Sequence, residues 1–221
     1  LKLPSAYCSF VNGGKLIKPI MIDRIQDSAG NTIFNNEKRK CSNCKQISPF
    51  SDHYPKIEDQ FPQIFSSETA YQMISILEGV VQRGTGKKLK NLKLDIAGKT
   101  GTTNGNTDAW FVGFTSKLAI GVYVGSDSPK PLGRYETGAK TALPIFKTFV
   151  KNAIRKDEAR PFKVADNILM MVIDPITGRK AEFASKTTII EVYKKNVIEK
   201  ENFINLDIKN RFKHKNILKF Y

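Results

Sequence analysis

The sequence lacks a long hydrophobic run, a histidine-based motif and a glycine-rich phosphate loop. No window approaches the ~18 consecutive apolar residues of a membrane-spanning helix, so we expect no such helix in this chain. Neither His53 nor His214 has the flanking residues of a catalytic triad or an H-E-x-x-H site. Gly98-Lys99-Thr100 matches the end of a phosphate loop, but that pattern needs glycine where Lys93 stands. We therefore expect no cofactor and no metal.

Cysteine is also scarce, and the three residues present cannot all pair with one another. Cys41 and Cys44 form a C-x-x-C pattern in a polar stretch. A zinc half-site and a redox pair are both conceivable, although zinc would need two further ligands, for which only Cys8 and His53 remain. We favour a pair within a loop, disulfide-bonded in an oxidising compartment.

The composition is that of a basic, foldable chain. With 221 residues, 40% of them hydrophobic, it can bury a sizeable core as one domain or as one domain plus a tail. Its 36 Lys and Arg against 21 Asp and Glu give a net charge of +15, which attracts nucleic acid, anionic lipid or acidic wall polymers. Lysine is spread along the chain without a nucleic-acid motif, so we expect a solvated basic surface and no specific nucleic-acid partner.

The N-terminal half shows two helical patterns with a hairpin and a long connection between them. Residues 5–12 have helical spacing and end at Gly13-Gly14, a helix stop signal. Residues 17–26 and 31–34 flank a turn and predict a hairpin, whereas residues 35–66 have no sustained period. The second helix is predicted from Ser67, as N-cap, to a stop at Gly84. Its predicted core face consists of Ala70, Met73, Ile74, Leu77, Val80 and Val81.

The C-terminal half predicts an antiparallel meander followed by a helix. An apolar strand beginning near residue 94 is followed by strands at 109–114 and 118–124, with short links between them. A helix is then predicted over 142–154, with a core face of Ala142, Ile145, Phe146, Phe149, Val150, Ala153 and Ile154. Residues 168–174 predict one more strand, with a turn after it.

One short segment of the meander carries the chemistry. Lys99-Thr100-Gly101-Thr102 places a cation, two hydroxyls and a glycine on consecutive extended residues. Lys99 supplies positive charge, and Thr100 and Thr102 supply hydrogen-bond donors for an anionic ligand. Gly101 removes the side chain that would keep a ligand backbone away from the strand. A simple hairpin with a polar turn is the plainer reading of the same stretch, supported by Asn104-Gly105.

The stretch resembles the transpeptidase domain of bifunctional (class A) penicillin-binding proteins. Lys-Thr-Gly is a known signature of penicillin-binding proteins and related β-lactamases. The resemblance also rests on longer runs before and after it: Tyr7-x-x-Phe10-x-Asn12-Gly13-Gly14, Ala97-Gly98-Lys99-Thr100-Gly101-Thr102-Thr103, Asp108-Ala109-Trp110-Phe111-Val112-Gly113-Phe114 and Gly121-Val122-Tyr123-Val124-Gly125-Ser126-Asp127. It covers roughly residues 5–182.

The resemblance implies an α+β fold, with an antiparallel sheet flanked by helices, of the penicillin-binding protein and serine β-lactamase type and incomplete in this chain. Residues 1–182 would be the C-terminal portion of the transpeptidase domain, and 183–221 a basic tail. The implied activity is DD-transpeptidation, an acyl transfer on D-Ala-D-Ala stem peptides of peptidoglycan. The implied location is the periplasm or cell envelope. The implied partners are stem peptides, β-lactams and the upstream half of the same protein.

The resemblance also assigns roles to individual residues. Lys99 and Thr102 would be catalytic, Lys99 through its charge and Thr102 through an N–H that stabilises the oxyanion. Thr100, Gly101, Thr102 and Thr103 would bind substrate, with the hydroxyls of Thr100 and Thr102 on its carboxylate. A ligand strand would lie along the sheet edge at Gly101.

The family's other two signatures are missing from these residues. Ser-x-Asn does not occur, and the one Ser-x-x-Lys, Ser42 to Lys45, lies in the cysteine-flanked loop after a segment that the family places behind its nucleophile. We therefore do not expect Ser42 to be the nucleophile, and we expect the chain to be inactive alone. Two alternatives stay open: an inactive remnant of a split gene, and a basic module that binds wall polymer or nucleic acid.

Overall fold

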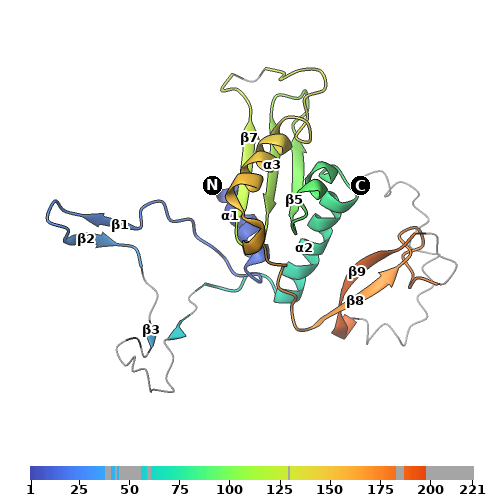
Figure 1. Ribbon diagram of the computed structural model, residues 1–221, viewed down its shortest axis with the longest axis horizontal. Coiled ribbons are helices and arrows are strands. Elements are labelled where there is room, and N and C mark those ends of the chain that lie inside the picture. The colour runs from blue at the N-terminus through green and yellow to red at the C-terminus, as the bar shows by residue number, and fades with distance from the viewer. Residues whose placement is uncertain are drawn as a thin grey trace.

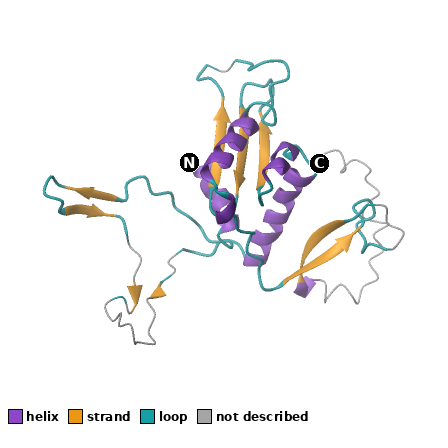
Figure 2. Cartoon of the chain, in the orientation of Figure 1, coloured by secondary structure: helices purple, strands orange, loops and turns teal. Residues whose placement is uncertain are grey.

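The computed structural model describes residues 1–37, 41–42, 44, 56–58, 61–128, 130–182 and 187–197. Its helices are α1 (Lys2–Val11), α2 (Ser67–Gln82) and α3 (Ala142–Ala153), with 3-10 segments η1 (Lys87–Leu92) and η2 (Lys156–Glu158). Its strands are β1 (Arg24–Gln26), β2 (Thr32–Asn35), β3 (Cys41–Ser42), β4 (Lys56–Ile57), β5 (Ala97–Thr102), β6 (Ala109–Phe114), β7 (Ala119–Val124), β8 (Ile168–Ile173) and β9 (Ile189–Lys194). Figure 2 shows the helices gathered around one antiparallel sheet, which confirms the predicted α+β class.

The sheet at the centre is the predicted meander. Its strands lie in the order β5-β6-β7, and both pairs are antiparallel and regular in register. The turn between β6 and β7 is closed by the Thr115 N–H, which donates to the Leu118 carbonyl at 2.8 Å. The strand patterns and their short links therefore predicted this sheet correctly.

Helices cover both faces of the sheet (Figure 1). On one face, Phe146 of α3 packs edge-on against Phe111 of β6, with ring centroids 4.6 Å apart. On the other face, Tyr7 of α1 packs edge-on against Phe114 at 6.2 Å. Because Phe111 and Phe114 lie an odd number of residues apart on one strand, their side chains point to opposite faces. The result is two hydrophobic clusters separated by the sheet.

Helix α1 ends where the sequence predicts and begins earlier. It starts at Lys2, and its end is closed by the Gly14 N–H, which donates to the Ser9 carbonyl at 2.8 Å. Gly13 and Gly14 have φ of +67° and +90°, a left-handed conformation that glycine adopts without steric cost. The glycine pair is therefore the stop signal that it was predicted to be.

Helix α2 packs beside β5, and its cap differs from the prediction by one residue. The N-cap is Ser66, whose hydroxyl accepts the Thr69 N–H at 3.2 Å, so Ser67 is the first helical residue. Two adjacent serines can each cap a helix, and the sequence pattern did not separate them. Tyr71 is buried where the predicted face had the half-buried Met73, because Tyr71 belongs to a hydrophobic cluster that also includes residues of α1, β8 and β9.

Helix α3 has the predicted position but a narrower buried face. Its fully buried side chains are Ala142, Leu143, Phe146 and Val150. Ile145, Phe149 and Ala153 were predicted to be in the core, but Ile145 and Phe149 are 51% and 52% exposed and Ala153 is exposed as well. The sheet covers only one stripe of the helix, and Leu143, absent from the predicted face, lies within that stripe.

Three strand pairs lie outside the central sheet (Figure 1). The predicted first hairpin is present as β1 and β2, but strand structure begins only at Arg24, after Pro19. Strand β3 pairs with β4 in the predicted long connection, and the sulfurs of Cys41 and Cys44 form a disulfide, as favoured from the sequence.

The third pair lies near the C-terminal end of the described residues. Strand β8 is the predicted strand, and it pairs along its whole length with β9, for which the sequence predicted no element. The Gln72 side chain of α2 donates to the Val192 carbonyl at 3.2 Å and ties this pair to the helix. In the part of the chain that the structure describes, no helix is both long and apolar enough to cross a membrane.

Candidate active site

The outer edge of β5 presents unpaired backbone groups. The Thr103 N–H donates to the Asp108 carbonyl at 3.1 Å, next to the pair Thr102 and Ala109. Hydrogen-bonded pairs alternate along an antiparallel ladder, so Lys99 and Gly101 bond to β6. The N–H and C=O groups of Thr100 and Thr102 therefore point away from β6. No described strand pairs with that side of β5, and an extended peptide could add there.

The Lys99 ammonium lies at this open edge. Lys99 is exposed, and its Nζ donates to the Thr100 carbonyl at 3.0 Å. This carbonyl is one of the groups that point outward from β5. The cation of the Lys-Thr-Gly segment is therefore held where an added strand would lie.

The hydroxyl of Thr100 has a partner from the end of α2. Its Oγ1 lies 2.9 Å from the Oγ1 of Thr85, and either atom could be the donor. Thr100 is half-buried and Thr85 is exposed. From the sequence, Gly84-Thr85-Gly86 was interpreted only as the end of a helix, so this contact was not predicted.

The hydroxyl of Thr102 has a partner from the loop before α3. The Gly138 N–H donates to its Oγ1 at 3.0 Å. A Cβ at position 138 would lie 2.5 Å from the Gly101 carbonyl oxygen and closer still to that of Trp110, so only glycine fits this approach. Since an N–H can only donate, the Thr102 hydroxyl proton remains free for an anion.

Gly101 and Thr103 complete the predicted set. Gly101 lies opposite Trp110, whose Cβ would be 3.2 Å from a Cβ added at Gly101. The Thr103 hydroxyl accepts the Asp108 N–H at 2.8 Å and bonds to the Thr107 hydroxyl at 2.8 Å. The structure thus brings Lys99, Thr100 and Thr102 to one edge, while Thr103 closes the loop into β6. A ligand contact from Thr103 stays a prediction.

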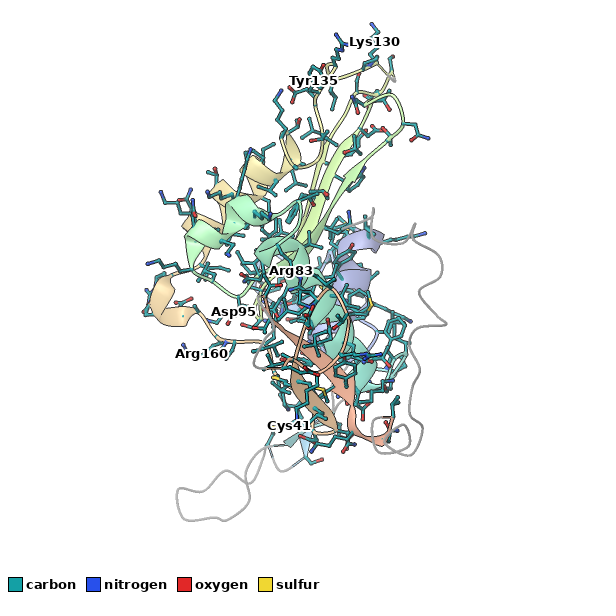
Figure 3. The ribbon with its side chains drawn as sticks, turned by 90° about the vertical axis from the view of Figure 1, so that its right-hand side faces the viewer. Cys41, Arg83, Asp95, Lys130, Tyr135 and Arg160 are labelled. Carbon is teal, nitrogen blue, oxygen red and sulfur yellow. A yellow bond between two sulfur atoms is a disulfide. The ribbon has the colours of Figure 1, made fainter. Side chains whose placement is uncertain are left out.

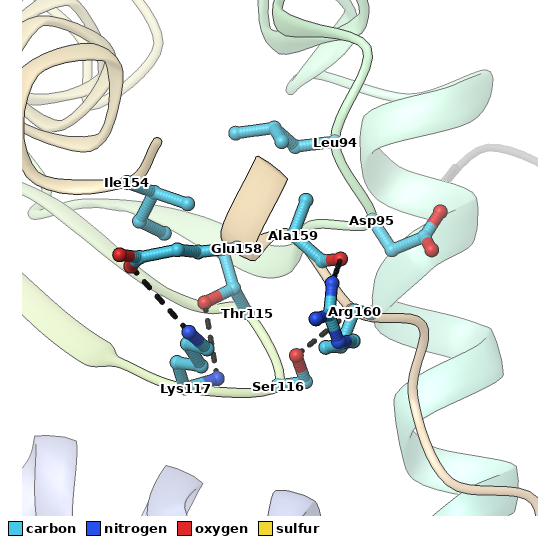
Figure 4. A pocket seen from close by; sticks show the side chains of 9 residues that line it. All are labelled: Leu94, Asp95, Thr115, Ser116, Lys117, Ile154, Glu158, Ala159 and Arg160. Atoms are coloured by element: carbon cyan, nitrogen blue, oxygen red, sulfur yellow. Dashed lines mark hydrogen bonds and ion pairs between the residues drawn. The ribbon is translucent and has the colours of Figure 1, made fainter. Parts of the chain in front are cut away.

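A separate hollow lies at the other end of the sheet (Figure 4). It is lined by residues before β5, in the β6–β7 turn and after α3. The Ser116 hydroxyl donates to the Arg160 carbonyl at 2.8 Å, and Lys117 forms an ion pair with Glu158 at 3.5 Å. Ser116, Lys117 and Glu158 are thus partnered within the hollow, and it lies away from the Lys99 to Thr102 edge.

The described residues offer no metal centre. Among them, no three His, Cys, Asp or Glu side chains come together as ligands. The disulfide occupies the thiols of Cys41 and Cys44 that a zinc half-site would use, and His53 lies outside the described residues. Burial raises the pKa of the Cys8 thiol, which keeps this cysteine protonated.

One carboxyl group beside the sheet has a strongly displaced pKa. Glu78 lies on α2, and burial, followed by repulsion from Asp95, raises its pKa to about 7. Figure 3 shows Asp95 on the segment that leads into β5 and Arg83 at the end of α2. The folded chain therefore holds a proton on Glu78 over a pH range in which the unfolded chain has lost it.

We expect this group to make the chain less stable as pH rises. The free energy of unfolding should fall between the unfolded pKa near 4.5 and the folded pKa near 7, because the folded state binds more protons in that window. Thermal unfolding from about pH 5 to about pH 7.5 should show this loss in the parent and a flatter curve for Glu78→Gln. Glu136→Gln is the control, because hydrogen bonds from Lys140 and Thr141 lower the Glu136 pKa. Parallel curves for the parent and Glu78→Gln would contradict the assignment.

The comparisons with known proteins agree on one family. The family profile described as "Penicillin binding protein transpeptidase domain" matches residues 1–151. Penicillin-binding protein 1A of Rickettsia prowazekii is 38% identical over 90% of this chain and 25% of its own length. Penicillin-binding protein 1A of Pseudomonas aeruginosa is 31% identical over 88% of this chain and 27% of its own.

A solved structure gives the same result for the fold. The crystal structure of penicillin-binding protein 1A from Haemophilus influenzae superposes with a TM-score of 0.68 and 31% identity. It covers 86% of this chain, which in turn covers 31% of that one. The chain spans about a quarter of the length of the curated relatives. By sequence and by fold, the chain belongs to the transpeptidase domain family of penicillin-binding proteins.

Proposed function

We propose that this chain forms one side of an acyl-transfer site that cross-links peptidoglycan, acting in the periplasm or cell envelope. The observation that carries the proposal is the open edge of β5, where Lys99, Thr100 and Thr102 lie together. A stem peptide ending in D-Ala-D-Ala would add along this edge as an extended strand. A β-lactam would occupy the same place.

Each residue then has a chemical role. The ammonium of Lys99 favours the anionic groups that the site handles, and the Thr102 N–H, which points outward, donates to the oxyanion formed on the attacked carbonyl. The hydroxyls of Thr100 and Thr102 donate to the terminal carboxylate of the substrate. Gly101, within β5, and Thr103, directly after it, lie along the path of the bound peptide.

The nucleophile in this proposal comes from polypeptide outside the given sequence. A serine oxygen attacks the carbonyl carbon of the penultimate D-Ala, and the bond to the terminal D-Ala breaks. An amine of a second stem peptide then takes the acyl group from the serine and regenerates its hydroxyl.

In the proposed division of the chain, residues 1–182 belong to the transpeptidase domain. Strand β9 lies beyond this boundary and pairs with β8.

The test is Thr102→Val in a protein that carries the Ser-x-x-Lys and Ser-x-Asn elements ahead of Leu1. Valine keeps the β-branched shape and the backbone N–H but removes the hydroxyl that would bind the carboxylate. A hydrogen bond to a charged group contributes about 1.5–3 kcal/mol, so penicillin acylation should slow about 10- to 150-fold.

Two controls separate binding from folding. Valine also leaves the buried Gly138 N–H without its acceptor, so the thermal midpoint should fall, and rates must be compared well below it. Thr102→Ser keeps the hydroxyl and should restore most of the rate, while Thr188→Val changes an exposed threonine beyond the site. Parent-like acylation by folded Thr102→Val would show that the carboxylate role is wrong.

A further inference from the structure

The G-T-G turn after α2, Gly84-Thr85-Gly86, is a tightly constrained turn beside the open edge of β5. The N–H groups of Gly84 and Gly86 both donate to the Val80 carbonyl, each at 3.0 Å, so the chain folds back over the last turn of the helix. A Cβ at Gly84 would lie 2.9 Å from the Val80 Cα, and one at Gly86 would lie 3.2 Å from the Val80 carbonyl oxygen. A side chain at Gly84 would clash with the Val80 backbone, and one at Gly86 would be tightly packed against Val80, so the turn constrains Thr85 from both sides.

Thr85 contributes little to the core from this position. Its side chain is exposed, whereas Gly86 and Leu89 after it are buried. Its hydroxyl lies 2.9 Å from the Thr100 hydroxyl, across 15 residues of sequence. A turn held this tightly, with its one polar side chain directed at a β5 threonine, suggests a role at the edge rather than in folding.

The direction of the proton in this pair depends on what lies at the edge. Each hydroxyl has one proton to donate and can accept two bonds. A carboxylate can only accept, so when one binds, Thr100 must donate to it, and Thr85 must then donate to Thr100. Hydrogen bonds in such a chain polarise one another, which strengthens the bond from Thr100 to the anion.

The two β5 threonines are then supported in the same way from different elements. The Gly138 N–H donates to the Thr102 hydroxyl, and the Thr85 hydroxyl can donate to that of Thr100. In both cases the second partner approaches from the body of the protein and leaves the threonine proton for a ligand.

We propose that Thr85 is a positioning residue that orients the Thr100 hydroxyl toward the anionic end of the substrate. The inference rests on the proposed acyl-transfer function and adds to it a residue outside the Lys-Thr-Gly segment. Thr85 acts through Thr100, so its effect must disappear when Thr100 has no hydroxyl.

The experiment measures acylation by a fluorescent penicillin in the protein completed with the Ser-x-x-Lys and Ser-x-Asn elements. Thr85→Val should slow acylation about 2- to 12-fold, the range of one neutral hydrogen bond, with little change in the thermal midpoint. Thr85→Ser keeps the hydroxyl and should restore the rate, and Thr188→Val should match the parent. In a Thr100→Val background, Thr85→Val should have no further effect.

The possible results distinguish a failure of the Thr85 positioning role from a failure of the proposed acyl-transfer function. If Thr100→Val slows acylation and Thr85→Val does not, or if Thr85→Val slows it equally without the Thr100 hydroxyl, the positioning role is wrong and the proposed function stands. If the completed parent is not acylated, or if Lys99→Ala, Thr100→Val and Thr102→Val all match it, the proposed function fails and the inference with it.

Discussion

Replacing Lys99 with alanine in the completed enzyme should slow penicillin acylation by at least about 10- to 150-fold, the range for a hydrogen bond to a charged group. Lys99 is the cation that the structure places at the open edge of β5, where its Nζ donates to the Thr100 carbonyl at 3.0 Å. That carbonyl faces outward, so an added peptide strand would compete for it. The ammonium is then released toward the ligand, whose negative charge it stabilises.

The control for this variant is a lysine of similar exposure away from the edge. Lys117 forms an exposed ion pair with Glu158 at 3.5 Å in the turn between β6 and β7. Exposed pairs of this kind contribute little, so Lys117→Ala should acylate like the parent. Both variants should keep the parental thermal midpoint, because neither side chain is in the core. Parent-like acylation by Lys99→Ala would remove this residue from the proposed chemistry.

Phe146→Ala should destabilise the isolated chain by about 3–5 kcal/mol, the usual cost of removing a buried aromatic ring. Phe146 is fully buried on α3, and its ring packs edge-on against Phe111 at 4.6 Å. Phe111 lies opposite Thr100 in the sheet, so this contact supports the strand that carries the site. Urea unfolding should show the loss as a lower midpoint.

The matched control lies on the same helix. Phe149 is 52% exposed, so Phe149→Ala removes a ring of the same size and leaves no enclosed cavity. Its urea midpoint should lie much closer to that of the parent. Equal midpoints for the two variants would mean that α3 does not cover the sheet as the structure shows.

The sequence predicted the structural features that depend on local periodicity. It did not predict those that depend on packing or pairing with a distant element. The strands of the meander are short segments that follow one another and are joined by short links, so their pairing follows from neighbouring residues. The exposure of Phe149 follows instead from how much of α3 the sheet covers. The spacing of apolar residues along the helix does not give the width of that covered stripe. Strand β9 was missed for a similar reason, because its register is set by pairing with β8.

The candidate site shows the same contrast between residues that local sequence predicts and contacts that distant residues supply. Lys99, Thr100 and Thr102 lie within four consecutive residues, so the Lys-Thr-Gly pattern and the threonine after it were enough to predict them as a candidate set. Their supporting contacts come from Thr85 and Gly138, which lie 15 and 36 residues from their partners. A glycine on each side of Thr85 was a visible signal of a constrained turn, but nothing local indicated which side chain it would meet.

The most direct measurement is covalent labelling by a fluorescent penicillin, followed by mapping of the modified residue. We expect no adduct on the 221-residue chain alone. We expect an adduct on the upstream Ser-x-x-Lys serine once that segment is joined ahead of Leu1, and weaker labelling in the Thr102→Val form. An adduct on the isolated chain, at Ser42 or at any other serine, would contradict the claim that this chain supplies only one side of the site.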